Sequence, residues 1–186
     1  MHAITNSLMK KNLLAGVLVS ILAVSLIAVI TALSVMKLGL LAINADQSPP
    51  AWEVRLLGMA VHASVARHAQ QQSNPVSATD ENLIAAAEIY SQMCAQCHGQ
   101  PHAGPSIFGA SFYPPVPQLP GRPTQYTEAE LFWIVKHGIR NTSMPAWGSL
   151  LSDQDIWEVV ALVKRFDALP PAVKAGWRSH RGASGE

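Results

Sequence analysis

The chain has 186 residues, of which 49% are hydrophobic and 13% are charged, and its formal net charge is +1. This length allows one domain of ordinary size with an additional segment, and two full domains are not expected. Lysine and arginine are not clustered, so the chain lacks the basic surface that binds a phosphate backbone, and nucleic acid is excluded as a partner.

A run of 24 uncharged and mostly apolar residues extends from Leu13 to Met36. About 20 such residues cross a bilayer as a helix. A signal peptide is the competing interpretation, but its apolar part usually has about 7 to 15 residues, and Ile43 fits the small-residue cleavage pattern poorly if the cut followed Ala45. Residues 1–45 are therefore predicted to be a short N-terminal stretch and an uncleaved transmembrane anchor, which contacts the lipid bilayer through residues 13–36.

The lysines around this run predict its orientation. Lys10 and Lys11 precede the run, and Lys37 alone follows it closely. Because positive residues remain on the cytoplasmic side, we expect a cytoplasmic N-terminus and a single pass. If the source is bacterial, the anchor lies in the inner membrane and the rest of the chain lies in the periplasm.

Residues 46–78 are predicted to be a linker that contains one amphipathic helix. Trp52, Leu56, Met59 or Ala60, and Ala63 recur at helical spacing. We expect this helix near the membrane surface or against a partner. Its two histidines, His62 and His68, are expected to be solvated.

A compact domain is predicted over residues 79–170, with three helices. Thr79 is expected to cap the first helix, and Thr127 with Glu130 forms a capping box for the second. Ser152 with Asp155 repeats this pattern before the third. The fold class is therefore all-α.

Six prolines lie between residues 102 and 125, where no regular element is expected. Three helices in about 90 residues give a thin core, so a bound group is expected to fill the centre of the domain. The polar stretch 171–186 is predicted to be a mobile C-terminal tail.

The only two cysteines lie three residues apart in "CAQCH", with a histidine directly after the second. C-x-x-C-H is the attachment motif of haem c. Cys94 and Cys97 are about one helical turn apart, so both thiols can add to vinyl groups along one porphyrin edge. His98 then lies under the iron, where a neutral imidazole nitrogen is a good ligand. Its other ring nitrogen is expected to donate to the carbonyl of Pro105 or a neighbour.

Three other uses of these cysteines are weaker. A structural disulfide across two residues would constrain little, and a redox-active disulfide leaves His98 without a role. A zinc site needs two further ligands, and only His102 is near.

The sixth iron ligand is expected to be Met144. It is the only methionine after His98, and it lies in the non-helical stretch "RNTSMPAWG", where Pro145 restricts it to extended geometry. A thioether ligand favours Fe(II) and raises the reduction potential. Met93, Met59 and His137 are the alternatives.

The order of a helix, "CAQCHG", a proline-rich loop, "LFWIVKHGIRNTSMPAWG" and a final helix with "IWEVVALVKRF" resembles a class I, monohaem cytochrome c domain, here preceded by a membrane anchor. The resemblance covers residues 79–169. It implies three to four short helices around one covalent haem c, with Cys94 and Cys97 as thioether sites, His98 as the proximal ligand and Met144 as the distal ligand. It also implies that the first and last helices of the domain cross, so that Tyr90 would meet Trp157 and Val160.

With both axial positions filled by the protein, one-electron transfer is the expected function, and the chain itself is not expected to be an enzyme. The expected partners are membrane respiratory complexes, such as a quinol-oxidising complex or a terminal oxidase, or the subunits of a dehydrogenase or oxidase. The chain would serve them as a shuttle or as a subunit. The alternative is a gas-binding or sensor protein with an open sixth coordination site.

Overall fold

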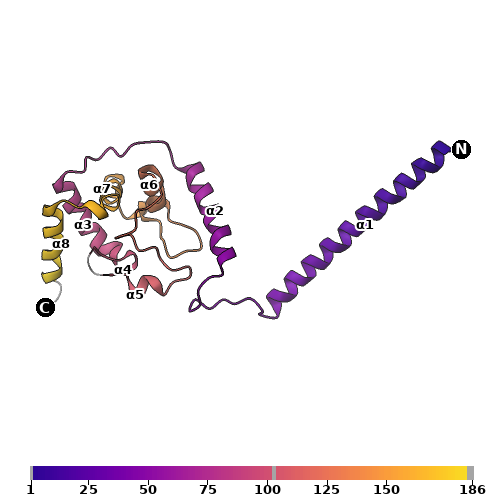
Figure 1. Ribbon diagram of the computed structural model, residues 1–186, viewed down its shortest axis with the longest axis horizontal. Helices are drawn as coiled ribbons and strands as arrows, with labels where there is room; N and C mark the ends of the chain where they lie inside the picture. The colour runs from indigo at the N-terminus through magenta and orange to yellow at the C-terminus, as the bar shows by residue number, and fades with distance from the viewer. Residues whose placement is uncertain (1, 102–103, 184–186) are drawn as a thin grey trace. The chain divides into compact units, whose positions relative to one another are not determined.

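The computed structural model describes residues 2–101 and 104–183, and it divides the chain into two units, Met1–Asn44 and Ala45–Glu186. All regular structure in the described residues is helical, which confirms the predicted all-α class (Figure 1).

The first unit consists mainly of helix α1, His2–Lys37. Its part Lys10–Lys37 has 28 residues with a mean hydropathy of 2.9, and none of its most apolar stretch is buried in the protein. By length and composition α1 can cross a membrane, although a signal sequence would share these properties.

In the second unit, α3 (Asp80–Met93) packs against α7 (Asp153–Val163). The predicted helix starts are confirmed. The Thr79 hydroxyl accepts the Asn82 N–H at 3.3 Å, and Ser152 begins α7 with a full capping box. The second predicted helix, α6 (Glu128–His137), begins with the capping box of Thr127 and ends at Gly138.

The core of this unit has two clusters. One surrounds Tyr90 and includes Leu83, Val159 and Leu162, whereas Trp157 and Val160 belong to the other, in which the rings of Phe132 and Trp157 stack at 4.2 Å. The first and last helices of the domain pack against each other, as the resemblance implies. The prediction that Tyr90 contacts Trp157 and Val160 is wrong. Those two side chains pack against α6, because neighbouring residues of α7 point in different directions around the helix.

The stretch predicted to be a polar tail forms helix α8, Pro171–Ala183. Val173 and Trp177 lie four residues apart, so they share one face of α8, and both are buried in the Tyr90 cluster. The centroid of the Trp177 ring is 5.7 Å from that of Tyr90. Two apolar residues at helical spacing therefore fix a segment whose average composition is polar.

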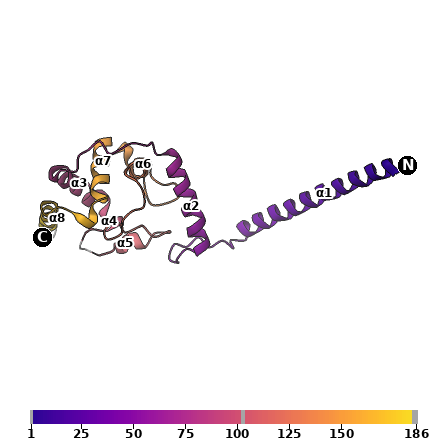
Figure 2. The same ribbon diagram turned by 45° about the horizontal axis from the view of Figure 1, so that its top comes forward.

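Helix α2, Ala51–His68, packs against α6, so the predicted linker 46–78 includes a helix that is part of the second unit. Val65 is the buried residue of α2. The ring of His62 stacks on Tyr126 and that of His68 on Trp133, with ring centroids 4.6 and 5.9 Å apart. Both histidines are exposed, as predicted, but one side of each ring contacts an aromatic side chain. Figures 1 and 2 agree that α2 and α8 lie on opposite sides of this unit.

Short elements complete the unit: α4 (Ala95–His98), α5 (Ile107–Ala110) and the 3₁₀ turns η1 (Trp147–Ser149) and η2 (Phe166–Ala168). The turn α5 lies in the proline-rich stretch where no element was expected. It forms because the Ser106 hydroxyl accepts the Gly109 N–H at 2.9 Å and caps the turn.

Candidate functional site

The turn α4 brings three of the four predicted site residues together. α3 ends at Met93, and the Cys97 and His98 N–H groups donate to the Cys94 carbonyl at 3.1 and 2.9 Å. Both cysteines are free and partly buried. Burial, with a smaller effect of Cys97, raises the pKa of Cys94 to about 12, so this thiol is neutral at ordinary pH. The turn therefore presents two thiols and an imidazole without a disulfide.

The imidazole of His98 has a defined orientation. Its Nδ1 lies 2.8 Å from the carbonyl oxygen of Pro117. Burial lowers the pKa of His98 and outweighs the hydrogen bond to Pro117, which raises it. A neutral ring that donates through Nδ1 keeps the lone pair on Nε2 for a metal. The prediction that the carbonyl of Pro105 or a neighbour accepts this hydrogen bond is wrong. The later part of the proline-rich loop, and not its beginning, lies beside the His98 ring.

Gln118, next to Pro117, ties this loop to the motif, and sequence reasoning missed it. Its side-chain amide donates to the carbonyls of Cys97 and Val116 at 3.1 and 3.0 Å, and its Oε1 accepts the Ser106 N–H at 2.6 Å. The Ser106 hydroxyl in turn donates to the carbonyl of Gln96. A single glutamine in a proline-rich stretch gives no sequence signal for this role.

Two further contacts, from Gly109 of α5 and Tyr90 of α3, fix the position of the turn α4. A Cβ on Gly109 would lie 2.0 Å from the Cys97 carbonyl oxygen, so only glycine allows α5 to approach α4 this closely. The Tyr90 hydroxyl donates to the Gly99 carbonyl at 2.9 Å. α3 and α5 therefore both fix the position of the motif.

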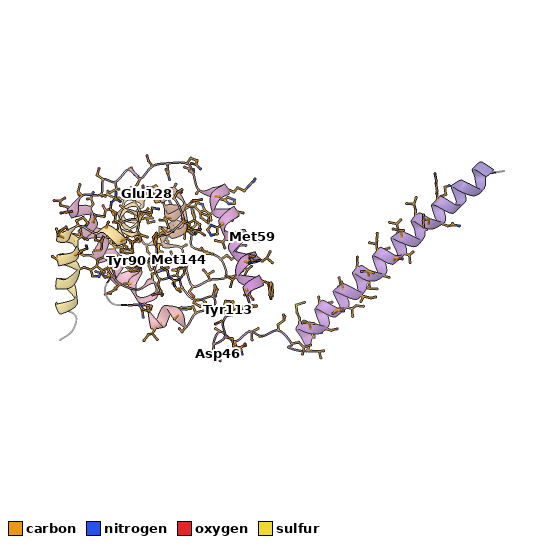
Figure 3. The ribbon with its side chains drawn as sticks, viewed as in Figure 1. Asp46, Met59, Tyr90, Tyr113, Glu128 and Met144 are labelled. Carbon is orange, nitrogen blue, oxygen red and sulfur yellow. The ribbon has the colours of Figure 1, made fainter. Side chains whose placement is uncertain are left out.

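Met144 lies on a separate loop that follows α6. Its N–H donates to the Thr142 hydroxyl at 3.1 Å, and its carbonyl accepts the Ile139 N–H at 3.1 Å. Gly138 has a φ of +67°, and a Cβ there would lie 2.7 Å from the Met144 carbonyl oxygen. The Met144 side chain is partly buried, and Figure 3 shows it within the second unit.

The three alternative sixth ligands lie on helices and not on the Met144 loop. Met93 ends α3 beside the motif and is partly solvent-exposed, and Met59 on α2 is 57% exposed. His137 is exposed at the end of α6, with its ring centroid 5.1 Å from that of Trp133.

The residues present fit a covalent haem c. The site offers two free thiols one turn apart, an imidazole whose Nδ1 is already hydrogen-bonded, and a thioether on a constrained loop. Within residues 2–101 and 104–183 no group of three or more His, Cys, Asp or Glu side chains could hold a metal ion, as a zinc site would require. His102, the additional zinc ligand that was considered, lies outside the described residues.

Comparison with known families supports the same cofactor. The family model described as "Cytochrome C oxidase, cbb3-type, subunit III" matches residues 81–163. The match includes Cys94, Cys97, His98 and Met144 and leaves out α1, α2 and α8. The match indicates that this part of the chain is a monohaem c-type cytochrome domain with a covalently bound haem c.

Proposed function

We propose that this chain is a membrane-anchored c-type cytochrome that carries single electrons on the periplasmic side, with Cys94, Cys97, His98 and Met144 as its haem-binding residues. The observation that carries the site assignment is the hydrogen bond from His98 Nδ1 to Pro117, on the same turn as both free thiols. It leaves one imidazole nitrogen available for iron beside two attachment points.

Cys94 and Cys97 form thioether bonds to the haem in this proposal, and His98 is the proximal ligand. The Gln118 amide and the close contact of Gly109 keep the turn fixed while its side chains are bound. The Pro117 carbonyl holds the imidazole ring in one orientation and increases its strength as a ligand.

Met144 is the distal ligand. Its loop is constrained by the two hydrogen bonds around Thr142 and Ile139 and by the contact with Gly138, so the backbone that carries the thioether is held in place. When bound, the haem supplies a one-electron Fe(II)/Fe(III) couple. If His98 and Met144 both bind the iron, no coordination site would remain for a substrate or a gas, and electron transfer would be the activity that remains.

A Met144→Ala variant tests the assignment. We expect it to retain covalent haem, because both thioether bonds and His98 are unaffected. Its reduced form should bind carbon monoxide, and its reduction potential should fall, since the thioether that stabilises Fe(II) is lost. Absorbance spectra of the reduced protein with and without carbon monoxide, together with a redox titration, measure both effects.

Met93→Ala is the matched control, and it should leave both properties unchanged. An unchanged potential in Met144→Ala would contradict the assignment of this ligand. Carbon monoxide binding by the unmodified chain would instead favour a gas-binding function with an open sixth site.

The anchor and the partner follow from α1 and from the matched family. α1 is long and apolar enough to span a bilayer, and the lysines around it favour a cytoplasmic N-terminus. The matched family consists of electron-transfer subunits of an oxidase complex, so we infer a membrane respiratory complex as the partner here.

Purification from native membranes in mild detergent should give a stoichiometric redox complex. A chain that purifies alone would contradict the subunit role and favour a free shuttle.

A further inference from the structure

Helix α2 has one face that is already occupied by its own domain. Val65 is 1% exposed and Val61 is partly buried, and both lie on the same side of the helix as Gly58. At the ends of this contact, Tyr113 donates to the Glu53 carboxylate at 3.0 Å, and His68 stacks on Trp133. These contacts fix the rotation of α2 about its axis, so its opposite face is also defined.

The opposite face carries an apolar stripe of Trp52, Leu56, Met59 and Ala63. These residues are spaced three or four apart, and the three large ones are 67%, 56% and 57% exposed. In the view of Figure 3, Met59 lies on the side of α2 turned away from Met144. The stripe therefore points away from the cytochrome domain, and it is a run of large apolar side chains of the kind that marks an interaction site.

The charges around the stripe restrict what can cover it. Arg55 and Arg67 are exposed and lie along its two edges, whereas Glu53, the only acidic residue of α2, faces Tyr113. An apolar strip bordered by arginines and free of acids is the pattern of a helix that lies in a lipid interface, with its cations at the phosphates. Trp52, at the start of the stripe, is the residue type most enriched at that depth.

The chain before α2 favours the same occupant. Residues 38–50 join the end of α1 to the start of α2, and a connection of this length reaches at most about 45 Å. Leu38, Leu40, Leu41 and Ile43 in this connection are exposed and apolar. A chain anchored by α1 thus presents the stripe to the membrane surface at a high effective concentration.

We propose that the stripe of α2 lies on the lipid headgroup surface and holds the cytochrome domain against the membrane. The proposal rests on the membrane anchoring in the proposed function, because the tether supplies the local concentration. With this contact, the domain has a fixed side toward the bilayer, and the face opposite α2 is directed away from it.

Photo-crosslinking in the intact chain tests this contact. The haem-loaded protein is placed in nanodiscs of phosphatidylethanolamine and phosphatidylglycerol, with p-benzoylphenylalanine in place of Leu56. The same probe replaces Ala175, an exposed residue of α8 on the other side of the unit, as the control. A third version carries it in place of Leu22, which is 69% exposed in α1 and reports on the anchor.

After illumination, mass spectrometry should find a phospholipid adduct for the probes at positions 22 and 56, and several-fold less for the probe at 175. The haem absorbance of each version confirms that it is folded. A Leu56→Glu substitution with the probe in place of Met59 should reduce the adduct several-fold, since a charge in the stripe opposes insertion.

The outcomes separate the two proposals. The membrane contact of α2 would be overturned, and the anchor left intact, if the probe at position 22 formed lipid adducts while the probe at position 56 formed no more of them than the probe at 175. A crosslink from position 56 to a second copy or to another protein would also overturn it. Lipid at position 56 without lipid at 22 would support the contact and contradict the anchor.

Discussion

At the scale of single residues, the motif turn depends on side chains that are distant in sequence. The Gln118 amide reaches the Cys97 carbonyl across 21 residues, and Gly109 allows α5 to touch the same carbonyl. His98 is oriented by Pro117, which belongs to the same loop. The C-x-x-C-H motif thus supplies the reactive atoms, and the proline-rich loop determines where they lie.

Gly109→Ala should disturb this arrangement. The new methyl group would lie 2.0 Å from the Cys97 carbonyl oxygen, so the backbone of α4 or α5 must shift, at a cost of about 1–3 kcal/mol. We expect less covalent haem per mole of protein, measured by the pyridine haemochrome absorbance of the denatured protein.

Gly58→Ala is the matched control, because it lies in α2 and has nothing within 4 Å of the added Cβ. It should retain full haem content and stabilise α2 by up to about 1 kcal/mol. Equal haem content in the two variants would show that the contact at Gly109 is not required.

At the scale of elements, local signals defined where helices begin, and buried side chains decided which segments pack. The capping boxes at Thr127 and Ser152 could be read directly, because each satisfies the N–H groups of its own first turn. Helix α8 has no such signal and is polar on average. It packs because Val173 and Trp177 enter the cluster around Tyr90.

Trp177→Ala tests the contribution of α8. The side chain is 5% exposed and contacts the rings of Tyr90 and Phe166, so its loss should destabilise the domain by about 3–5 kcal/mol. The midpoint of chemical denaturation, followed by helical circular dichroism of the haem-loaded protein, measures this change.

The matched substitution is Trp52→Ala, since Trp52 is 67% exposed on α2. In detergent solution it should shift the midpoint far less. If both variants denatured at the same concentration, α8 would not be part of the folded core.

At the scale of the whole molecule, α2 extends the cytochrome domain beyond the residues that match the family. It begins 30 residues before the matched region, yet it packs on α6, buries Val65 and contacts the chain around Tyr113 and Tyr126. The connection from α1 therefore ends on a helix that belongs to the folded domain and not on a free linker.

Val65→Asp should release α2 from the domain. Val65 is 1% exposed, and a carboxylate there would be buried without a partner, which costs several kcal/mol. Hydrogen exchange in the intact haem-loaded chain should show faster exchange over residues 51–68, with little change in α3 and α7.

Ala66→Asp places the same charge on the next, exposed residue of α2 and should leave this exchange nearly unchanged. Equally fast exchange in the two variants would mean that the charge weakens α2 itself and that docking on α6 contributes little.

Much of this protein could be predicted from the sequence alone, because the signals are local. The apolar run of α1, the three capped helices of the domain and the C-x-x-C-H motif each depend on residues within one or two turns of one another. The family match confirmed the covalent haem c and the monohaem cytochrome domain. The roles of Cys94, Cys97, His98 and Met144 remain predictions, and the Met144→Ala variant tests the last of them.

Only the tertiary structure decided which distant groups meet. The acceptor for His98, the bridge through Gln118, the docking of α8 and the rotation of α2 all join residues separated by long stretches of chain. Such contacts follow from how the loops close, and many closures have similar entropy costs. No single residue pattern encodes them, so the packing of the whole domain had to select among them.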